Sequence, residues 1–302
     1  MTELDLRFNR LTNFTLPEDT TNLVFLTLFA NQLTNVTLPS NLQRLANLDL
    51  EGNRLSGLSF PSGLTNLGTL ILRANQLTNL AFPEDMTNLT FVDIGGNQLA
   101  NLTMPAPLPH LNFLRLSTNR LTSLALPSGM TNLGAVFLNG NQLTNLTLAS
   151  GMTNLVQLDL RGNQLATLTL PPDLFRLSSL LLDGNPLRTL ILSETQAATR
   201  LAGLVATLRA QGVSVITYPV SIQLTSPHQV GGGAFAFTLT GPPGVYFVSQ
   251  SRDLEIWNKI GTTTNTVGSI LFIDPEVPLT SQKFYRAISV EPVQDPAGTI
   301  PF

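Results

Sequence analysis

Side chains that could act as acid–base catalysts near neutral pH are few in this chain. The 302-residue sequence contains two histidines, His110 and His228, and no cysteine. His110 stands at a position that Asn88 and Asn132 occupy 22 residues to either side, so we expect a structural surface role for it. No serine lies in a motif that would supply it with a base. Gly231-Gly232-Gly233 is not placed between a strand and a helix, so it is no phosphate loop. We therefore expect no enzymatic activity.

Four aspartates could be imagined as cation ligands, because they share one position of a repeating pattern. They are Asp5, Asp49, Asp93 and Asp159. Neighbouring strands lie about 4.8 Å apart, so carboxylates on alternate repeats would be roughly 10 Å apart. Calcium takes about six to eight oxygen ligands at about 2.3–2.6 Å. These aspartates therefore cannot share one ion, and we expect a solvated face with no metal and no cofactor.

A third group of side chains is suited to binding. The outward strand positions are expected to carry Phe25, Phe29, Phe91, Phe113 and Phe137. Phe91 and Phe113 lie 22 residues apart, hence in register on neighbouring repeats. Arg73, Asp93 and Arg115 lie nearby in the pattern. Exposed aromatic rings beside arginine are typical of interaction hot spots. The equally supported alternative is that neighbouring side chains cover the rings, or that phenylalanine simply suits a strand.

One motif, Leu-x-Leu-x-x-Asn-x-Leu, positions all these side chains, and it first occurs at Leu4–Leu11. Its asparagine recurs at steps of 22 residues, as Asn9, Asn31, Asn53, Asn75, Asn97, Asn119, Asn141, Asn163 and Asn185. A fixed period of this length predicts a solenoid. The alternation in Leu158-Asp159-Leu160 predicts a strand with one buried face. Asn163 then turns inward, where its amide can pair with backbone groups that lack ladder partners, and stacked copies would form a structural asparagine ladder.

The second half of each repeat also alternates, as in Leu143–Leu148, where Leu146 and Leu148 are expected to point inward. Proline closes this half at Pro17, Pro39, Pro61, Pro83, Pro105, Pro127 and Pro171. Because proline has no N–H, it ends ladder pairing and begins a turn. We therefore expect strands on two faces and few helices.

These motifs resemble the leucine-rich repeat family over about residues 1–192. The second half of the unit, Leu-Thr-Asn-Leu-Thr-Leu-Pro, is similar to that of the short bacterial 22-residue subtype. The resemblance implies a mainly β solenoid of nine repeats, with both long sides of each coil extended. It also implies weaker curvature than in a helix-backed horseshoe.

After the repeats we expect a carboxy-terminal cap at residues 193–219, with a helix over 194–210 and a strand over 213–218. Ser193 is the expected N-cap and Gly212 the expected helix stop. Short strands between glycines and prolines predict a small antiparallel sandwich over residues 220–290, followed by a tail at 291–302.

Residues 244–287 resemble a small domain found near the carboxy ends of secreted bacterial proteins. The resemblance rests on Tyr246-Phe247-Val248, Leu254 before Trp257, Asp274-Pro275 and Phe284-Tyr285-Arg286-Ala287. It implies a secreted or cell-surface bacterial protein. We expect Trp257 and Tyr285 to be core residues of this domain, because a small domain needs its aromatic side chains for the interior.

Composition restricts the partners. A net charge of −3 with 12% charged residues argues against nucleic acid, which requires a clustered basic face. The sequence has no apolar run long enough to span a membrane. The absence of cysteine excludes disulfides and thiolate metal sites.

We expect a non-enzymatic recognition scaffold that binds a protein or glycan through the β face of the solenoid, because solenoids present extended regular surfaces. One alternative is a self-assembling extracellular structural protein. The sequence begins inside a repeat, with Met1 at the position of Leu155 and neither a signal peptide nor a polar cap, so the first coil could pack on another molecule. A trimmed or missing upstream segment would explain the same feature.

Ice binding is a further alternative, based on a row of threonines at Thr15, Thr37, Thr103, Thr147 and Thr169. Ser59, Ala81, Ala125 and Ile191 interrupt this row. Threonine also simply favours strands.

Overall fold

The computed structural model describes residues 1–104, 108–275 and 282–290. The chain forms two compact units, one of Met1–Leu190 with Thr199–Ser214 and one of Ile191–Ala198 with Val215–Phe302. Pro105 and the expected tail 291–302 lie outside the described residues.

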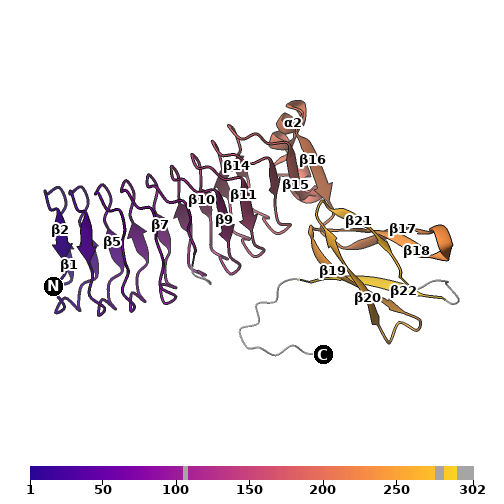
Figure 1. Cartoon of the computed structure of the whole chain (residues 1–302), viewed down its shortest axis with the longest axis horizontal. Helices are drawn as coiled ribbons and strands as arrows, with labels where there is room; N and C mark the ends of the chain where they lie inside the picture. The colour runs from indigo at the N-terminus through magenta and orange to yellow at the C-terminus, as the bar shows by residue number, and fades with distance from the viewer. Residues whose placement is uncertain (105–107, 276–281, 291–302) are drawn as a thin grey trace. The chain divides into compact units, whose positions relative to one another are not determined.

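The first unit is a mainly β solenoid, as predicted (Figure 1). We number its coils 1 to 9 after the nine repeated asparagines. Each coil contributes one strand to a nine-stranded parallel sheet, whose outer surface we call the front face. The strands in order are β1 (Glu3–Asp5), β3 (Phe25–Thr27), β5 (Asn47–Asp49), β6 (Thr69–Ile71), β7 (Phe91–Asp93), β8 (Phe113–Arg115), β10 (Ala135–Phe137), β12 (Gln157–Asp159) and β14 (Ser179–Leu181). Paired residues differ by 22, so Phe91 lies opposite Phe113.

The interior is a column of aliphatic side chains. The central leucines of the front strands, such as Leu48, Leu70 and Leu114, are completely buried. So are Met86 and Met130, which return to the core after the turn that follows the second half of the coil. Since each coil buries its side chains against its neighbours, stability depends on stacking rather than on any single coil.

In coils 2 to 9, the asparagine after the front strand joins its coil to the preceding one. Asn97 Nδ2 donates to the carbonyl of Ile94 and, one coil earlier, to that of Leu72, both at 3.0 Å. Asn97 Oδ1 accepts from the N–H of Leu77 at 3.0 Å. Seven asparagines share this buried arrangement: Asn31, Asn53, Asn75, Asn97, Asn119, Asn141 and Asn163. Asn9 in coil 1 is exposed and Asn185 in coil 9 is half-buried.

The opposite side of the coils, which we call the rear face, also carries strands. They are β2 (Asn13–Thr15), β4 (Asn35–Thr37), β9 (Ser123–Leu126), β11 (Asn145–Leu148), β13 (Thr167–Thr169) and β15 (Thr189–Ser193). They form the short parallel pairs β2-β4 and β9-β11, and β13 and β15 form a three-stranded sheet with β16 (Ser214–Tyr218). The prediction of strands on two faces is therefore confirmed. However, coils 3 to 5 have no rear strand in the described residues, and only a bridge between Ala81 and Thr103.

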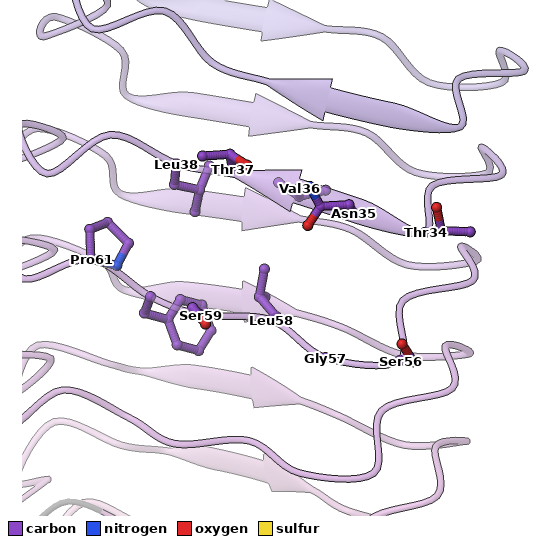
Figure 2. A pocket seen from close by; sticks show the side chains of 11 residues that line it. Thr34, Asn35, Val36, Thr37, Leu38, Ser56, Gly57, Leu58, Ser59 and Pro61 are labelled. Carbon is purple, nitrogen blue, oxygen red and sulfur yellow. The ribbon is translucent and has the colours of Figure 1, made fainter.

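An opening separates coils 2 and 3 on the rear face (Figure 2). This pocket of about 620 Å³ lies between residues 34–38 and 56–61. Gly57 stands where coil 2 has Asn35, and Phe60 where coil 2 has the buried Leu38. Glycine weakens a strand, and the larger phenyl ring is only half-buried, stacking on Phe82 at 6.0 Å instead. These substitutions account for the missing strand in coil 3.

The predicted helical segment after the repeats is present in two pieces. They are α1 (Glu194–Ala198) and α2 (Ala202–Ala210), followed by β16 (Ser214–Tyr218). Ser193 Oγ accepts from the N–H of Gln196 at 3.2 Å, and Gln196 Oε1 accepts from the N–H of Ser193 at 2.9 Å. This reciprocal pair is a capping box. Gly212, at φ 84°, ends α2, and its N–H donates to the carbonyl of Arg209 at 3.0 Å.

The second unit contains two three-stranded antiparallel sheets, as predicted for a small sandwich. Their orders are β17-β18-β21 and β20-β19-β22. The strands are β17 (Gln223–Gln229), β18 (Phe235–Thr240), β19 (Gly244–Ser251), β20 (Asn258–Asn265), β21 (Ser269–Ile273) and β22 (Phe284–Ser289). Both sheets contribute to one core, which consists of Phe237, Leu239, Tyr246, Val248 and Phe272.

The two aromatic residues expected in that core have different environments. Tyr285 packs against the core cluster. Trp257 is half-buried and lies outside the cluster, so its assignment to the core was wrong. Its indole N–H donates to the carbonyl of Leu254 at 3.1 Å, and the guanidinium of Arg286 lies 4.4 Å from its ring centroid. Trp257 thus packs within a surface turn and beneath a cation.

Candidate interaction surface on the front face

The front face presents three outward positions per coil, and parallel pairing aligns them into columns along the solenoid. The first column is the first residue of each front strand and includes Phe91 and Phe113. The second column is the third strand residue and includes Asp93, Arg115 and Phe137. The third column lies two residues further along each coil.

Phe91, Phe113 and Phe137 form a continuous row of rings across coils 5 to 7. Phe91 and Phe113 stack at a centroid distance of 4.5 Å with 5° between their planes. Phe137 follows at 5.2 Å from Phe113 with a tilt of 40°. All three are half-buried. We call these three residues the aromatic cluster. In the stacked pair each ring covers one face of the other, so these two faces are closed to a ligand.

Arg115 completes the cluster. Its guanidinium carbon lies 5.3 Å from the ring centroid of Phe113 and 5.1 Å from that of Phe137. Its Nη1 donates to Asp93 Oδ2 at 3.3 Å, while Asp93 Oδ1 accepts from the N–H of Gly95 at 3.0 Å. The ion pair and the cation–π contacts hold Arg115 against the rings.

The aspartates of the second column are not uniformly solvated, which corrects the expectation from the sequence. Asp93 is 5% exposed and Asp159 is 2% exposed, because Arg115 and Arg161 cover them. Arg161 Nη2 donates to Asp159 Oδ2 at 2.7 Å. Burial alone would raise the pKa of Asp159, but the hydrogen bonds from the Arg161 side chain and backbone outweigh it and lower that pKa. Asp49 has no such cover, and burial raises its pKa.

A trough of about 540 Å³ runs beside the aromatic cluster from coil 4 to coil 8. We call it the arginine trough; it is lined by Arg73, Ala74, Gly95, Gly96, Arg115, Ser117, Thr118, Phe137, Asn139, Gln157, Asp159 and Arg161. Its shape follows from the third column, which holds Gly95, Ser117 and Asn139 between two arginines. Because these three side chains are shorter than the arginines at either end, they leave the trough open between the arginines.

Of the residues predicted from the sequence, the structure brings together the aromatic cluster, Asp93 and Arg115, with Arg73 at the end of the trough. Phe25 and Phe29 lie in coil 2, three coils from Phe91. Phe29 contacts Phe8 edge-on at 5.0 Å, and Phe25 is 47% exposed.

Sequence reasoning missed Phe8, Ser117, Asn139 and Arg161. For Ser117, Asn139 and Arg161 the signal was present, because the residues two positions after each front strand recur every 22 residues. Reading that third column would have shown two arginines flanking small residues. In the described residues, no group of three or more acidic or histidine side chains is placed to hold a metal ion.

A family model described as the BspA type leucine rich repeat region matches six copies over residues 7–112 and 95–198. No curated protein matches the chain. No helix in the described ranges is long and apolar enough to cross a membrane.

Among solved structures, YopM from Yersinia pestis, described as a leucine-rich effector protein, is 28% identical with a TM-score of 0.53, covering 64% of this chain and 54% of that one. YopM from Yersinia enterocolitica WA-314 is also 28% identical, with a TM-score of 0.47 over 63% of this chain and 43% of that one. The leucine-rich repeat domain of APL1B shares the fold at 24% identity and a TM-score of 0.51, covering 65% of each chain. In each case the matched region is less than two thirds of the relative's own length.

The repeated motif, the coil geometry and the family match over residues 7–198 agree. The chain belongs to the BspA-type leucine-rich repeat family.

Proposed function

We propose that this chain is a non-enzymatic recognition scaffold that binds a protein partner through the front face, centred on the aromatic cluster. The leucine-rich repeat fold is typical of protein-interaction scaffolds. The observation that carries the proposal is the row of Phe91, Phe113 and Phe137 with Arg115 packed on it. Aromatic and arginine side chains are the residues most enriched at binding hot spots.

The geometry of the cluster favours a protein over a glycan. A sugar packs its C–H groups against the electron-rich face of an aromatic ring. In the cluster, Phe91 and Phe113 each cover one face of the other, and Arg115 lies beside Phe113 and Phe137. Ring edges next to a flat sheet are better matched by the apolar side chains of a protein surface.

The arrangement of charged groups supports binding rather than catalysis. Asp93 and Asp159, the buried carboxylates of the front face, are engaged by arginine and by backbone N–H groups. A general acid or base needs a free position within hydrogen-bond reach of a substrate.

We further propose a secreted or cell-surface location for this bacterial-type protein, on the basis of the resemblance of residues 244–287. We propose the domain division 1–192, 193–219, 220–290 and 291–302 on the sequence pattern.

The alternative of self-assembly would use β1, the first strand in the sheet order, beside the exposed Phe8. Light scattering over a range of concentrations separates the two, since a partner-binding scaffold stays monomeric when concentrated. The gap in rear strands across coils 3 to 5 weighs against ice binding, because it breaks the flat threonine array.

The test is capture of partners from culture supernatant with the full chain as bait. We expect the double variant Phe91→Ser/Phe113→Ser to lose proteins that the wild-type chain retains. Phe175→Ser is the matched control, since Phe175 is 63% exposed and lies outside the front strands. Equal capture by all three chains would refute the proposed role of the cluster.

A further inference from the structure

We propose that the arginine trough binds carboxylate side chains on an extended acidic segment of the partner. This inference rests on the proposed function, because the trough shares Arg115 and Phe137 with the aromatic cluster. It adds the chemistry of the partner, which the cluster alone does not specify.

The ion pairs around the trough are asymmetric. The Asp159 side chain is 3% exposed while its partner Arg161 is 51% exposed. The Asp93 side chain is 7% exposed against 32% for Arg115. Each carboxylate lies beneath its guanidinium, so a molecule approaching the front face meets the positive member of each pair first.

The arginines also retain unused hydrogen-bond donors. A guanidinium carries five N–H groups. Arg73 Nη1 comes no closer than 3.9 Å to Glu51 Oε1, which is beyond hydrogen-bond distance. Arg115 engages Asp93 through Nη1, and Arg161 engages Asp159 through Nε and Nη2. The remaining N–H groups are available to an acceptor on a partner.

The floor of the trough supplies further donors. Asn139, which lines the trough, accepts from Ser117 Oγ through Oδ1 at 2.6 Å, and this bond does not use its amide N–H groups. Asp159 is the acidic residue in the lining, and both its oxygens already accept from Arg161. The lining therefore sets three arginines, Arg73, Arg115 and Arg161, against one carboxylate that is already paired, and arginine forms paired hydrogen bonds with a carboxylate.

The length of the trough indicates an extended segment. Arg73 and Arg161 are four coils apart, which corresponds to about 19 Å at about 4.8 Å per strand. An extended chain covers that distance in about six residues at about 3.3 Å each. A single small anion would reach one arginine at a time, whereas a segment with spaced Asp or Glu residues reaches several. Its apolar side chains would lie on the adjacent aromatic cluster, so we assign a peptide rather than an acidic polysaccharide.

The experiment is a selection of displayed 12-residue peptides on the full chain, followed by fluorescence anisotropy with the enriched peptides. We expect enrichment of Asp and Glu together with apolar residues, and weaker binding as salt increases. Arg73→Gln and Asn139→Asp should each lower affinity about tenfold. Neither variant removes the partner of a buried charge. Arg120→Gln and Asn101→Asp are the matched controls, since both residues are exposed and lie outside the trough.

The outcomes separate the two proposals. If the peptides lose binding to Phe91→Ser/Phe113→Ser but bind the two trough variants normally, the inference falls and the proposed function stands. If the peptides bind all of these variants as tightly as the wild-type chain, both the inference and the proposed function are refuted. Absence of acidic enrichment, failure to select any peptide, or tighter binding of a polygalacturonate oligomer than of the peptides would also overturn the inference.

Discussion

Arg161 lies two residues after Asp159 in the same coil and closes over its carboxylate, with Nη2 at 2.7 Å from Oδ2. Asp49 occupies the same strand position five coils earlier, yet no arginine in the described residues forms an ion pair with it. The same residue type at the same position of the repeat therefore has opposite pKa shifts.

For Asp159, the folded-state pKa is lowered, since the hydrogen bonds from Arg161 outweigh burial. The ionised carboxylate therefore stabilises the fold above its unfolded pKa of about 3.9, and this contribution disappears as pH falls through the folded pKa. We expect Asp159→Asn to lower the free energy of unfolding at pH 7 by about 1–2 kcal/mol. Urea unfolding of the wild type and the variant at pH 7 and near pH 3 checks this. If the two chains differ in free energy of unfolding by the same amount at both pH values, the prediction is contradicted.

For Asp49, burial raises the folded-state pKa, so its contribution to stability changes with pH in the opposite direction. The wild-type chain loses stability as pH rises from the unfolded pKa through the folded pKa. We expect Asp49→Asn to stabilise the chain at pH 7 by less than about 1 kcal/mol, because the side chain is still partly solvated. The same urea series measures it. A destabilised variant at pH 7 would show that the charge of Asp49 has a favourable partner.

The aromatic cluster should contribute more to binding than to folding. Phe91 and Phe113 are half-buried, so we expect Phe91→Ser/Phe113→Ser to remain folded with a nearly unchanged Tm while partner capture is lost. Thermal unfolding monitored by circular dichroism is the measurement. Loss of the folded baseline at 25 °C would instead make these rings part of the core.

The loss of unfolding free energy on replacing a ladder asparagine should depend on the coil in which it lies. Replacing Asn97 with alanine removes its bonds to Ile94, Leu72 and Leu77 and leaves buried backbone groups unpaired. We expect a loss of roughly 3 kcal/mol or more. Asn9→Ala is the control, because the exposed Asn9 donates to Leu6 and Arg7 in its own coil. Similar unfolding midpoints in urea for the two variants would contradict the ladder's role.

Gly57 offers a test of the interrupted rear face. A Cβ at Gly57 would meet nothing within 4 Å, and the backbone there is not left-handed. We expect Gly57→Ala to stabilise the chain by about 0.5 kcal/mol through the unfolded state. Gly151→Ala, at φ 95°, should destabilise it instead. If both variants shift the urea midpoint in the same direction, backbone geometry is not the cause.

The fold was predictable because the 22-residue period determines which residues stack on which. Once Asn97 and Asn119 are aligned, the buried leucines, the strand register and the outward columns all follow. Two features could not be obtained in this way. The missing rear strand of coil 3 depends on how Phe60 and Gly57 fit against coil 2, which a repeat pattern averages out.

The second feature is the burial of Asp93 and Asp159. Alternation along a strand gives the direction of a side chain but not what covers it, and here long arginine side chains from the same or the next coil do so. The sequence therefore led to the aromatic cluster, through adjacent phenylalanines, but not to the trough, whose shape arises from side chains that are short.

The opening behind coils 2 and 3 has a mechanical consequence. Hydrogen bonds join the front strands of every coil, whereas the rear strands are joined in coils 1 and 2, in coils 6 and 7 and in coils 8 and 9, and coils 4 and 5 share only an isolated bridge. Flexing of the stack should therefore concentrate at coils 3 to 5, and coils 6 and 7 should move as one stiff block. Phe113 and Phe137 lie on that block while Phe91 lies at its border, so a partner that binds all three rings would restrain bending between coils 5 and 6.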